Sequence, residues 1–283
     1  MSNQRNESRR KNTASIPEPN SAPQVGGDIL NFTVPTEIID LPSGGKMYPV
    51  GHPVYGKDAI EIRHMTTKEE DILSSQSLLR KGVAIDRMMN NIIMDEGVQV
   101  EDLIIGDRNA LMYAARISGY GPEYGVFVDC DECEKEFEHQ FDLSNYTDGY
   151  KKMEEGEDYR FTDNGTVEFT LPMSKVVVQI RALTGEDEKR LEKVREMKEK
   201  NNLPEAGLTD MLKMMLFSAN GVEDKSQLNK FIDKIPARDS KSMRDLYRKV
   251  MPNVVIKEEV DCSHCGHTME MEVPILGDFF WPG

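Results

Sequence analysis

Hydrophobic and polar residues alternate in two short segments of the chain, and each segment leads into a stretch with helical character. Residues 58–64 (DAIEIRH) and 176–181 alternate with the period of two that is typical of β-strands. In both places a threonine and several acidic residues follow. A threonine can cap the first turn of a helix, and the helix dipole favours acidic residues there. The pattern therefore predicts a strand followed by a helix, twice.

Further helical segments follow both strands, so the sequence predicts an α+β fold class. The last helix of each series begins at an aspartate, Asp107 or Asp239, and we expect Asp107 to cap its helix. Each of these aspartates lies 23 residues before a cysteine pair. The expected helices run from 66 toward 79, over 84–94, over 108–117, from 184 onward, over 208–218 and over 239–250.

The two strand–helix segments also resemble each other residue by residue. Residues 60–71 (IEIRHMTTKEED) match residues 178–189 (VQIRALTGEDEK) in type at most positions, at an offset of 118. The offset is 132 at the cysteines, and the extra residues fit a longer helix and loop around 192–207. Convergent use of a common strand–helix unit is one explanation. The cysteine turns that both halves share favour the other, an ancient duplication.

The duplication sets the expected domain boundaries. The first residues are rich in Asn, Ser, Pro and Gln and include a basic cluster from Arg5 to Lys11. Such a segment cannot bury enough apolar area to offset the entropy of ordering. A solvated tail and a tether for an acidic partner both remain open for it. The expected parts are a disordered arm over 1–34, a first half over 35–141, a joint over 142–174 and a second half over 175–283.

The four cysteines form two Cys-x-x-Cys turns, each between segments that alternate like strands. This arrangement predicts two hairpins with the cysteines at their tips. Two such tips supply the four thiolates that zinc prefers in a closed tetrahedral site. The 128 residues between the pairs exceed zinc-ribbon spacing, but in a duplication each half contributes half of one site. We therefore expect one zinc-ribbon-like site that holds a structural Zn²⁺ ion on Cys130, Cys133, Cys262 and Cys265.

Other uses of these cysteines remain open. His139 or His267 could replace one ligand, and the four thiols could instead stay free or form redox disulfides. A redox Cys-x-x-Cys usually stands at the start of a helix in a βαβ unit, whereas these turns lie between strands. A closed four-thiolate site leaves no position for a substrate, so it argues against catalysis.

Charge and composition narrow the class of protein. The chain has 35 Lys and Arg against 50 Asp and Glu, which gives a net charge of −15 and a pI of about 4.9. This charge repels nucleic-acid phosphates. We find no apolar run that could span a membrane, no secretory signal, and no phosphate-binding, dinucleotide or hydrolase motif. The composition is that of an acidic, cytosolic, globular protein.

The last residues carry three adjacent aromatic side chains, Phe279, Phe280 and Trp281. Three neighbouring aromatics cannot easily all face one core from a chain end. One interpretation is an anchor that binds a partner, since exposed aromatics often supply binding energy. The other is that the segment folds back over the hairpins. The residues alone leave both interpretations open, and the anchor is the prediction to be tested.

Several segments together resemble the baseplate hub assembly family of T4-like contractile-tailed bacteriophages. They are IDLPSGGKMYP (39–49), IEIRHMTTKEEDIL (60–73), LIIGDRNALMYAARISGYG (103–121), the paired Cys-x-x-Cys turns and FFWP (279–282). The resemblance implies a non-enzymatic protein that serves assembly of the tail baseplate hub, as a chaperone or as a minor structural component. It implies hub and tape-measure proteins as partners. It implies the host cytoplasm as the place of assembly, and the virion tail baseplate if the protein stays in the particle.

Two functions of other classes compete with this interpretation. A zinc-ribbon module that binds nucleic acid or acts as an adaptor would use the same cysteines, although the net charge disfavours nucleic acid. An oxidoreductase would use the Cys-x-x-Cys pairs for disulfide exchange.

Overall fold

The computed structural model describes residues 32–204, 206–275 and 279–281. Most of the arm expected over 1–34 therefore lies outside the described residues. Residues Pro35–Gly283 form one compact unit, which is described below. Within the described part of the chain, no helix combines the length and apolar character needed to cross a membrane.

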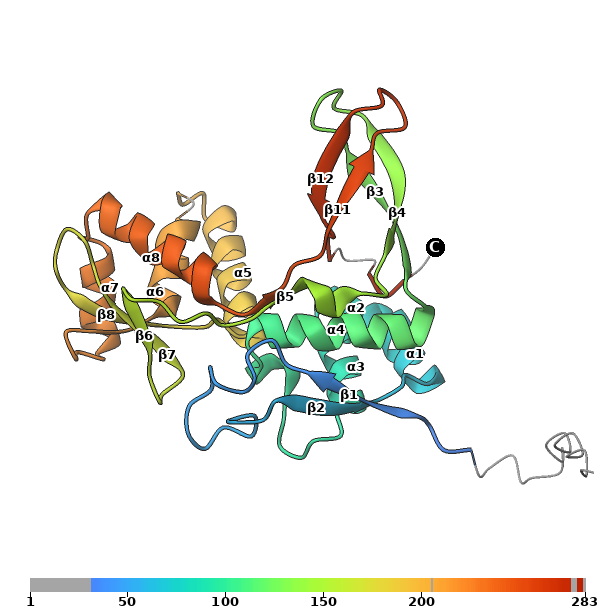
Figure 1. Ribbon diagram of the computed structural model, residues 1–283, viewed down its shortest axis with the longest axis horizontal. Helices are drawn as coiled ribbons and strands as arrows, with labels where there is room; N and C mark the ends of the chain where they lie inside the picture. Colours follow the sequence, from blue (N-terminus) through green and yellow to red (C-terminus); the bar gives the residue numbers. More distant parts are fainter. Residues whose placement is uncertain (1–31, 205, 276–278, 282–283) are drawn as a thin grey trace, which may run out of the picture. The chain divides into compact units, whose positions relative to one another are not determined.

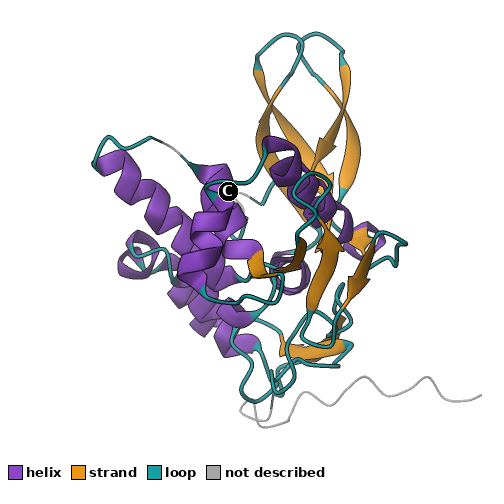
Figure 2. Cartoon of the chain, turned by 90° about the vertical axis from the view of Figure 1, so that its left-hand side faces the viewer, coloured by secondary structure: helices purple, strands orange, loops and turns teal. Residues whose placement is uncertain are grey.

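Helices and short strands alternate through the second unit, so the fold is mixed α+β as predicted (Figures 1 and 2). The helices are α1 (Thr67–Ser74), α2 (Gln76–Arg80), α3 (Ala84–Ile92), α4 (Ile105–Tyr120), α5 (Gly185–Lys200), α6 (Gly207–Met215), α7 (Lys225–Ile232) and α8 (Ala237–Val250), with 3₁₀ turns at Val100–Asp102 and Tyr146–Gly149. The strands are β1 (Thr36–Asp40), β2 (Ala59–Arg63), β3 (Glu123–Asp129), β4 (Glu136–Asp142), β5 (Tyr150–Lys151), β6 (Tyr159–Phe161), β7 (Thr166–Thr170), β8 (Val177–Arg181), β9 (Leu216–Ala219), β10 (Asn253–Val254), β11 (Lys257–Asp261) and β12 (Thr268–Glu272).

All the sheets among the described residues are small and antiparallel. Four are two-stranded, pairing β1 with β2, β3 with β4, β5 with β10 and β11 with β12. The fifth has the order β6-β7-β8-β9. Both strands that the alternation predicted are present, as β2 and β8, and each pairs with a strand that precedes it.

Three expected helix boundaries are wrong for identifiable reasons. The helix expected from 66 toward 79 is interrupted at Ser75, whose extended backbone ends α1. The helix expected over 208–218 ends at Met215, because the next four residues form β9 and complete the sheet beside β8. Asp107 is not a cap, since α4 begins two residues earlier and Asp107 lies buried in its first turn.

The two strand–helix junctions use the same contacts. Thr66 and Glu69 form a capping box at the start of α1, and Thr184 and Asp187 form one at the start of α5. In each case the last arginine of the preceding strand makes a bidentate ion pair with the carboxylate of the box. The nitrogen–oxygen distances are 2.7 and 2.9 Å for Arg63 with Glu69, and 2.6 and 2.9 Å for Arg181 with Asp187.

A buried aspartate in the first turn of a long helix also recurs. Asp107 of α4 accepts hydrogen bonds from the backbone N–H and hydroxyl of Ser43 and from the hydroxyl of Tyr48. Asp239 of α8 accepts from two backbone N–H groups in the turn between β7 and β8. Burial raises the pKa of Asp107 despite its donors, whereas the backbone donors outweigh burial and lower the pKa of Asp239. Each aspartate ties its helix to the turn of a β-hairpin.

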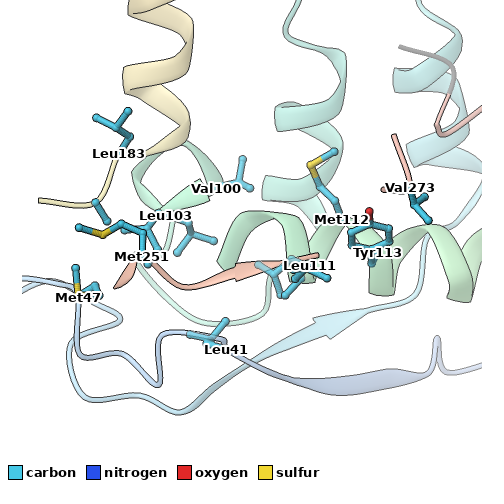
Figure 3. Packing of buried hydrophobic residues seen from close by; sticks show 14 of the residues in the cluster. Leu41, Met47, Val100, Leu103, Leu111, Met112, Tyr113, Leu183, Met251 and Val273 are labelled. Carbon is cyan, nitrogen blue, oxygen red and sulfur yellow. The ribbon is translucent and has the colours of Figure 1, made fainter. Parts of the chain in front are cut away.

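One hydrophobic core includes residues from the two expected halves of the chain, 35–141 and 175–283. Figure 3 shows Leu183 and Met251 beside Leu103, and Leu111 and Tyr113 on α4 face the same interior. Backbone hydrogen bonds join the two parts directly, from Ile105 to the carbonyl of Leu183 and from Gly185 to the carbonyl of Leu103.

The ion pair at the first junction makes stability depend on pH. Burial alone would raise the pKa of Glu69, but the hydrogen bonds from Arg63 and Thr66 lower the pKa from 4.5 to about 2. The ionised carboxylate therefore stabilises the fold above pH 4.5, and this stabilisation is lost as the pH falls toward 2.

We predict that Glu69→Gln lowers the free energy of unfolding at pH 7 by on the order of 2 kcal/mol. The difference from wild type should shrink between pH 4.5 and 2, as the wild-type carboxylate becomes protonated. Urea unfolding at pH 7 and pH 3 measures both values. The exposed neighbour Glu70, changed to Gln, is the control. Equal effects of the two substitutions at pH 7 would contradict the assignment.

Candidate metal centre

Two β-hairpins carry the four cysteines, as the sequence predicted. The β3–β4 hairpin has Cys130 and Cys133 in its turn, and the β11–β12 hairpin has Cys262 and Cys265. The hairpins lie side by side and their turns meet at the same end (Figures 1 and 2). The two halves of the cluster are thus brought together from segments far apart in the sequence.

The two turns have the same backbone geometry. The first cysteine of each pair accepts a hydrogen bond from the residue four positions later, Glu134 at 3.0 Å and Gly266 at 2.9 Å. The same cysteine donates to the carbonyl of the residue five positions later. Glu134 and Gly266 both have positive φ, 55° and 73°. Glycine adopts this conformation freely, whereas a glutamate adopts it at a cost of about 1 kcal/mol or more.

The four sulfur atoms converge on one point. All four lie within 4.8 Å of one another. The Sγ atoms of Cys130 and Cys265 are 3.7 Å apart, and those of Cys133 and Cys262 are 3.8 Å apart. A disulfide needs about 2.05 Å. A tetrahedral ion with metal–sulfur bonds of about 2.3 Å places its ligands about 3.8 Å apart. The spacing therefore suits four thiolates around one ion and does not suit disulfides.

The electrostatics of the four thiols also fit a cation. Burial alone would raise the pKa of Cys262, but the N–H groups of Cys265 and His264 lower it to about 7. The N–H of His267 lowers the pKa of Cys265, yet desolvation and the neighbouring thiols outweigh it and raise the pKa to about 12. The Cys262 thiolate therefore forms readily, whereas ionisation of Cys265 needs a compensating positive charge nearby.

The histidines near the turns are not part of the cluster. His139 lies 3.5 Å from a carboxylate oxygen of Glu258, and His267 lies 3.1 Å from a carboxylate oxygen of Asp131. The His264 ring contacts the carbonyl of Glu136 at 3.1 Å and so joins the two hairpins. That contact could not be predicted, because it depends on the packing of the hairpins. Among the described residues, the four cysteines are the one group placed to hold a metal ion.

The terminal aromatics lie inside the chain's own core, contrary to the expected outward anchor. The side chains of Phe279 and Phe280 are both 0% exposed. The Phe279 ring makes edge-to-face contacts with Tyr113 and Tyr124, at centroid distances of 5.4 and 5.1 Å. Trp281 is half-buried and donates from Nε1 to the carbonyl of Leu73 at 3.1 Å. Buried rings offer no surface to a partner, so the prediction of an outward anchor is wrong for Phe279 and Phe280.

A buried arginine that the sequence analysis missed holds this terminal segment. Arg116 of α4 is 1% exposed, and burial lowers its pKa. Its guanidinium donates to the carbonyls of Phe279 at 2.8 Å, Gly121 at 2.7 Å and Glu123 at 2.9 Å. One side chain thereby joins the end of α4, the start of β3 and the terminal segment. The helical pattern of residues 108–117 carries no signal for this role, because the three carbonyls come from segments outside that range.

We predict that Phe280→Ala lowers the free energy of unfolding by about 3 kcal/mol or more, because it leaves a cavity in the core. Phe127→Ala, at a ring that is 62% exposed, should change it by less than about 1 kcal/mol. Thermal and urea unfolding of the two variants measure the difference. Similar small effects of both substitutions would show that the terminal segment does not belong to the core.

Comparison with known proteins places the chain in a family. The comparison with curated proteins returned no match, and the comparison with solved structures returned none either. Residues 34–281 match the family described as T4 bacteriophage base plate protein. The matched region contains both cysteine hairpins, the two capping boxes and the terminal aromatics. Because the match covers most of the chain, this protein belongs to the T4 bacteriophage base plate protein family.

Proposed function

We propose that this protein serves assembly of the baseplate hub by binding hub components, as a chaperone or a minor structural component, without performing a covalent step. Membership of a baseplate protein family supports a role in the phage baseplate. The cysteine cluster supports the absence of a covalent step, because four protein ligands leave a metal no open position for a substrate. The proposed partners are hub and tape-measure proteins, met in the host cytoplasm during assembly.

The observation that carries the proposal is the closed sulfur cluster between two hairpins. Tetrahedral four-sulfur sites hold zinc or iron–sulfur centres, and a single ion with ligands about 3.8 Å apart is the zinc arrangement. We propose one structural Zn²⁺ ion on Cys130, Cys133, Cys262 and Cys265. Bound there, the ion fixes one hairpin against the other and so presents a rigid scaffold for protein contacts.

The same ion would join two related halves, over 35–141 and 175–283, with 142–174 as the joint. The paired capping boxes support this division, as do the buried aspartates of α4 and α8 and the matching cysteine turns. Each feature occurs once in each half, in the same order along the chain. Duplication explains the shared order more simply than separate origin of each contact.

We predict one equivalent of zinc per chain in protein purified under reducing conditions. The double variant Cys130→Ser with Cys262→Ser should lose the ion and should melt at a lower temperature, because each hairpin loses one ligand. His267→Asn, which changes a neighbouring side chain outside the cluster, is the matched control and should keep its zinc. Elemental analysis and thermal unfolding measure both effects. Wild-type protein without stoichiometric metal would refute the site.

If the protein binds hub components, it should have specific binding partners in infected cells. Tagged protein should copurify with hub and tape-measure proteins, and mass spectrometry of complexes and of mature virions should show whether it stays in the particle. The cysteine double variant should recover less of these partners, and the His267→Asn control should recover wild-type amounts. Recovery of nucleic acid in place of hub proteins, with salt-dependent binding, would support the zinc-ribbon alternative and contradict the proposal.

A further inference from the structure

A groove of about 760 Å³ lies along one side of α8, against β7 and the turn after it. Pro172, after β7, and Leu246 of α8 are partly exposed and supply the accessible apolar surface, since Phe169 is buried. The cations that line it are Arg238, Lys241 and Lys249. The groove therefore offers an apolar floor with positive charge beside it.

Helix α8 is basic in an acidic protein. It contains five Arg and Lys residues but two aspartates, in a chain with a net charge of −15. One of the two, Asp239, is buried and bonded to backbone N–H groups. The other, Asp245, pairs with Lys241 and Arg248 on the surface. With Asp158 it is one of two carboxylates that line the groove, so positive charge predominates there without being uniform.

A surface of the opposite kind lies on the β3–β4 hairpin. Phe127, Asp129, Glu136 and Glu138 are exposed and lie on one face of it, which we call the acidic face. Phe127 is 62% exposed and stands opposite Glu138, while Asp129 stands opposite Glu136. Like charges directly opposed across two strands are destabilising. Among the described residues, the three carboxylates of this face have no recorded ion pair with a cation.

The groove and the acidic face are complementary in charge and in apolar content. An exposed aromatic ring flanked by carboxylates matches an apolar floor flanked by cations, the usual anatomy of an apolar centre with a polar rim. Within one chain, the described residues show no hydrogen bond or ion pair between α8 and the hairpin. The hairpin tips also point away from α8 (Figure 1). A contact between the two surfaces therefore needs two molecules.

We propose that the acidic face of one copy docks in the α8 groove of a second copy. Phe127 then covers Pro172 and Leu246, and the carboxylates of the face lie opposite Lys241 and Lys249. Since the two surfaces belong to different parts of the chain, the contact is head-to-tail. Repetition of such a contact gives a closed ring or an open row of subunits. The inference goes beyond the proposed function and does not rest on it.

Sedimentation of the full chain at about 50 mM salt tests the contact. The mean mass of the wild type should rise with concentration, and it should return toward that of the monomer at about 0.5 M salt, where surface charges are screened. Glu136→Lys with Glu138→Lys, and separately Lys241→Glu with Lys249→Glu, should each weaken association by about tenfold or more. Phe127→Ser should weaken it without changing the charge.

An equal mixture of the two charge-reversed variants gives the sharpest result. Neither should associate alone, but in the mixture an intact groove meets an intact face, so association should return. Glu157→Lys with Glu199→Lys, and Lys193→Glu with Lys200→Glu, make the same net changes at other exposed positions and should behave like wild type.

Three outcomes would overturn the proposal: a wild type that stays monomeric at low salt, controls that weaken association equally, or a mixture that does not associate. Copurification with hub proteins is a separate measurement, so failure here leaves the proposed function intact.

Discussion

Two sulfur–sulfur contacts of 3.7 and 3.8 Å join cysteines that are 135 and 129 residues apart in the chain. Among the described residues, neither hairpin has a third strand beside it, and isolated two-stranded hairpins are marginally stable in water. Their mutual position therefore depends on the cluster at the tips and on the core at the base. The four sulfurs lie close enough to hold one metal ion, and four thiolates at this spacing would repel one another without a cation between them.

The base of the hairpins depends on α4. Arg116 donates three hydrogen bonds to carbonyls, and one of them fixes the terminal segment that carries Phe279. Asp107, at the other end of the same helix, fixes the turn between β1 and β2. Arg116 and Asp107 are both buried, so removal of the groups that hydrogen-bond to either side chain would leave a buried polar group without a partner. The helix thus connects the strand–helix part of the fold to the hairpins.

Local features of the fold could be predicted from the sequence, whereas contacts between distant segments could not. The alternation at 58–64 and the threonine with acidic residues after it identify β2 and the start of α1, because both depend on neighbouring residues. The cysteine spacing predicted the two hairpin turns, whose four sulfur atoms lie within 4.8 Å of one another. The outward anchor at Phe279 and Phe280 was wrong, because both rings are buried and Phe279 packs against Tyr113 and Tyr124, which are distant in sequence. Leu216 looked helical until pairing with β8 made it a strand residue.

The central claim is that four cysteines from two hairpins hold one tetrahedral ion. Addition of Co²⁺ tests this proposal directly, because cobalt absorption reports both the geometry and the ligand type. Titration of metal-free protein should give the intense visible bands of tetrahedral cobalt with thiolate charge-transfer absorption, saturating at one equivalent per chain. The weak spectrum of octahedral cobalt, or saturation at another ratio, would contradict the account.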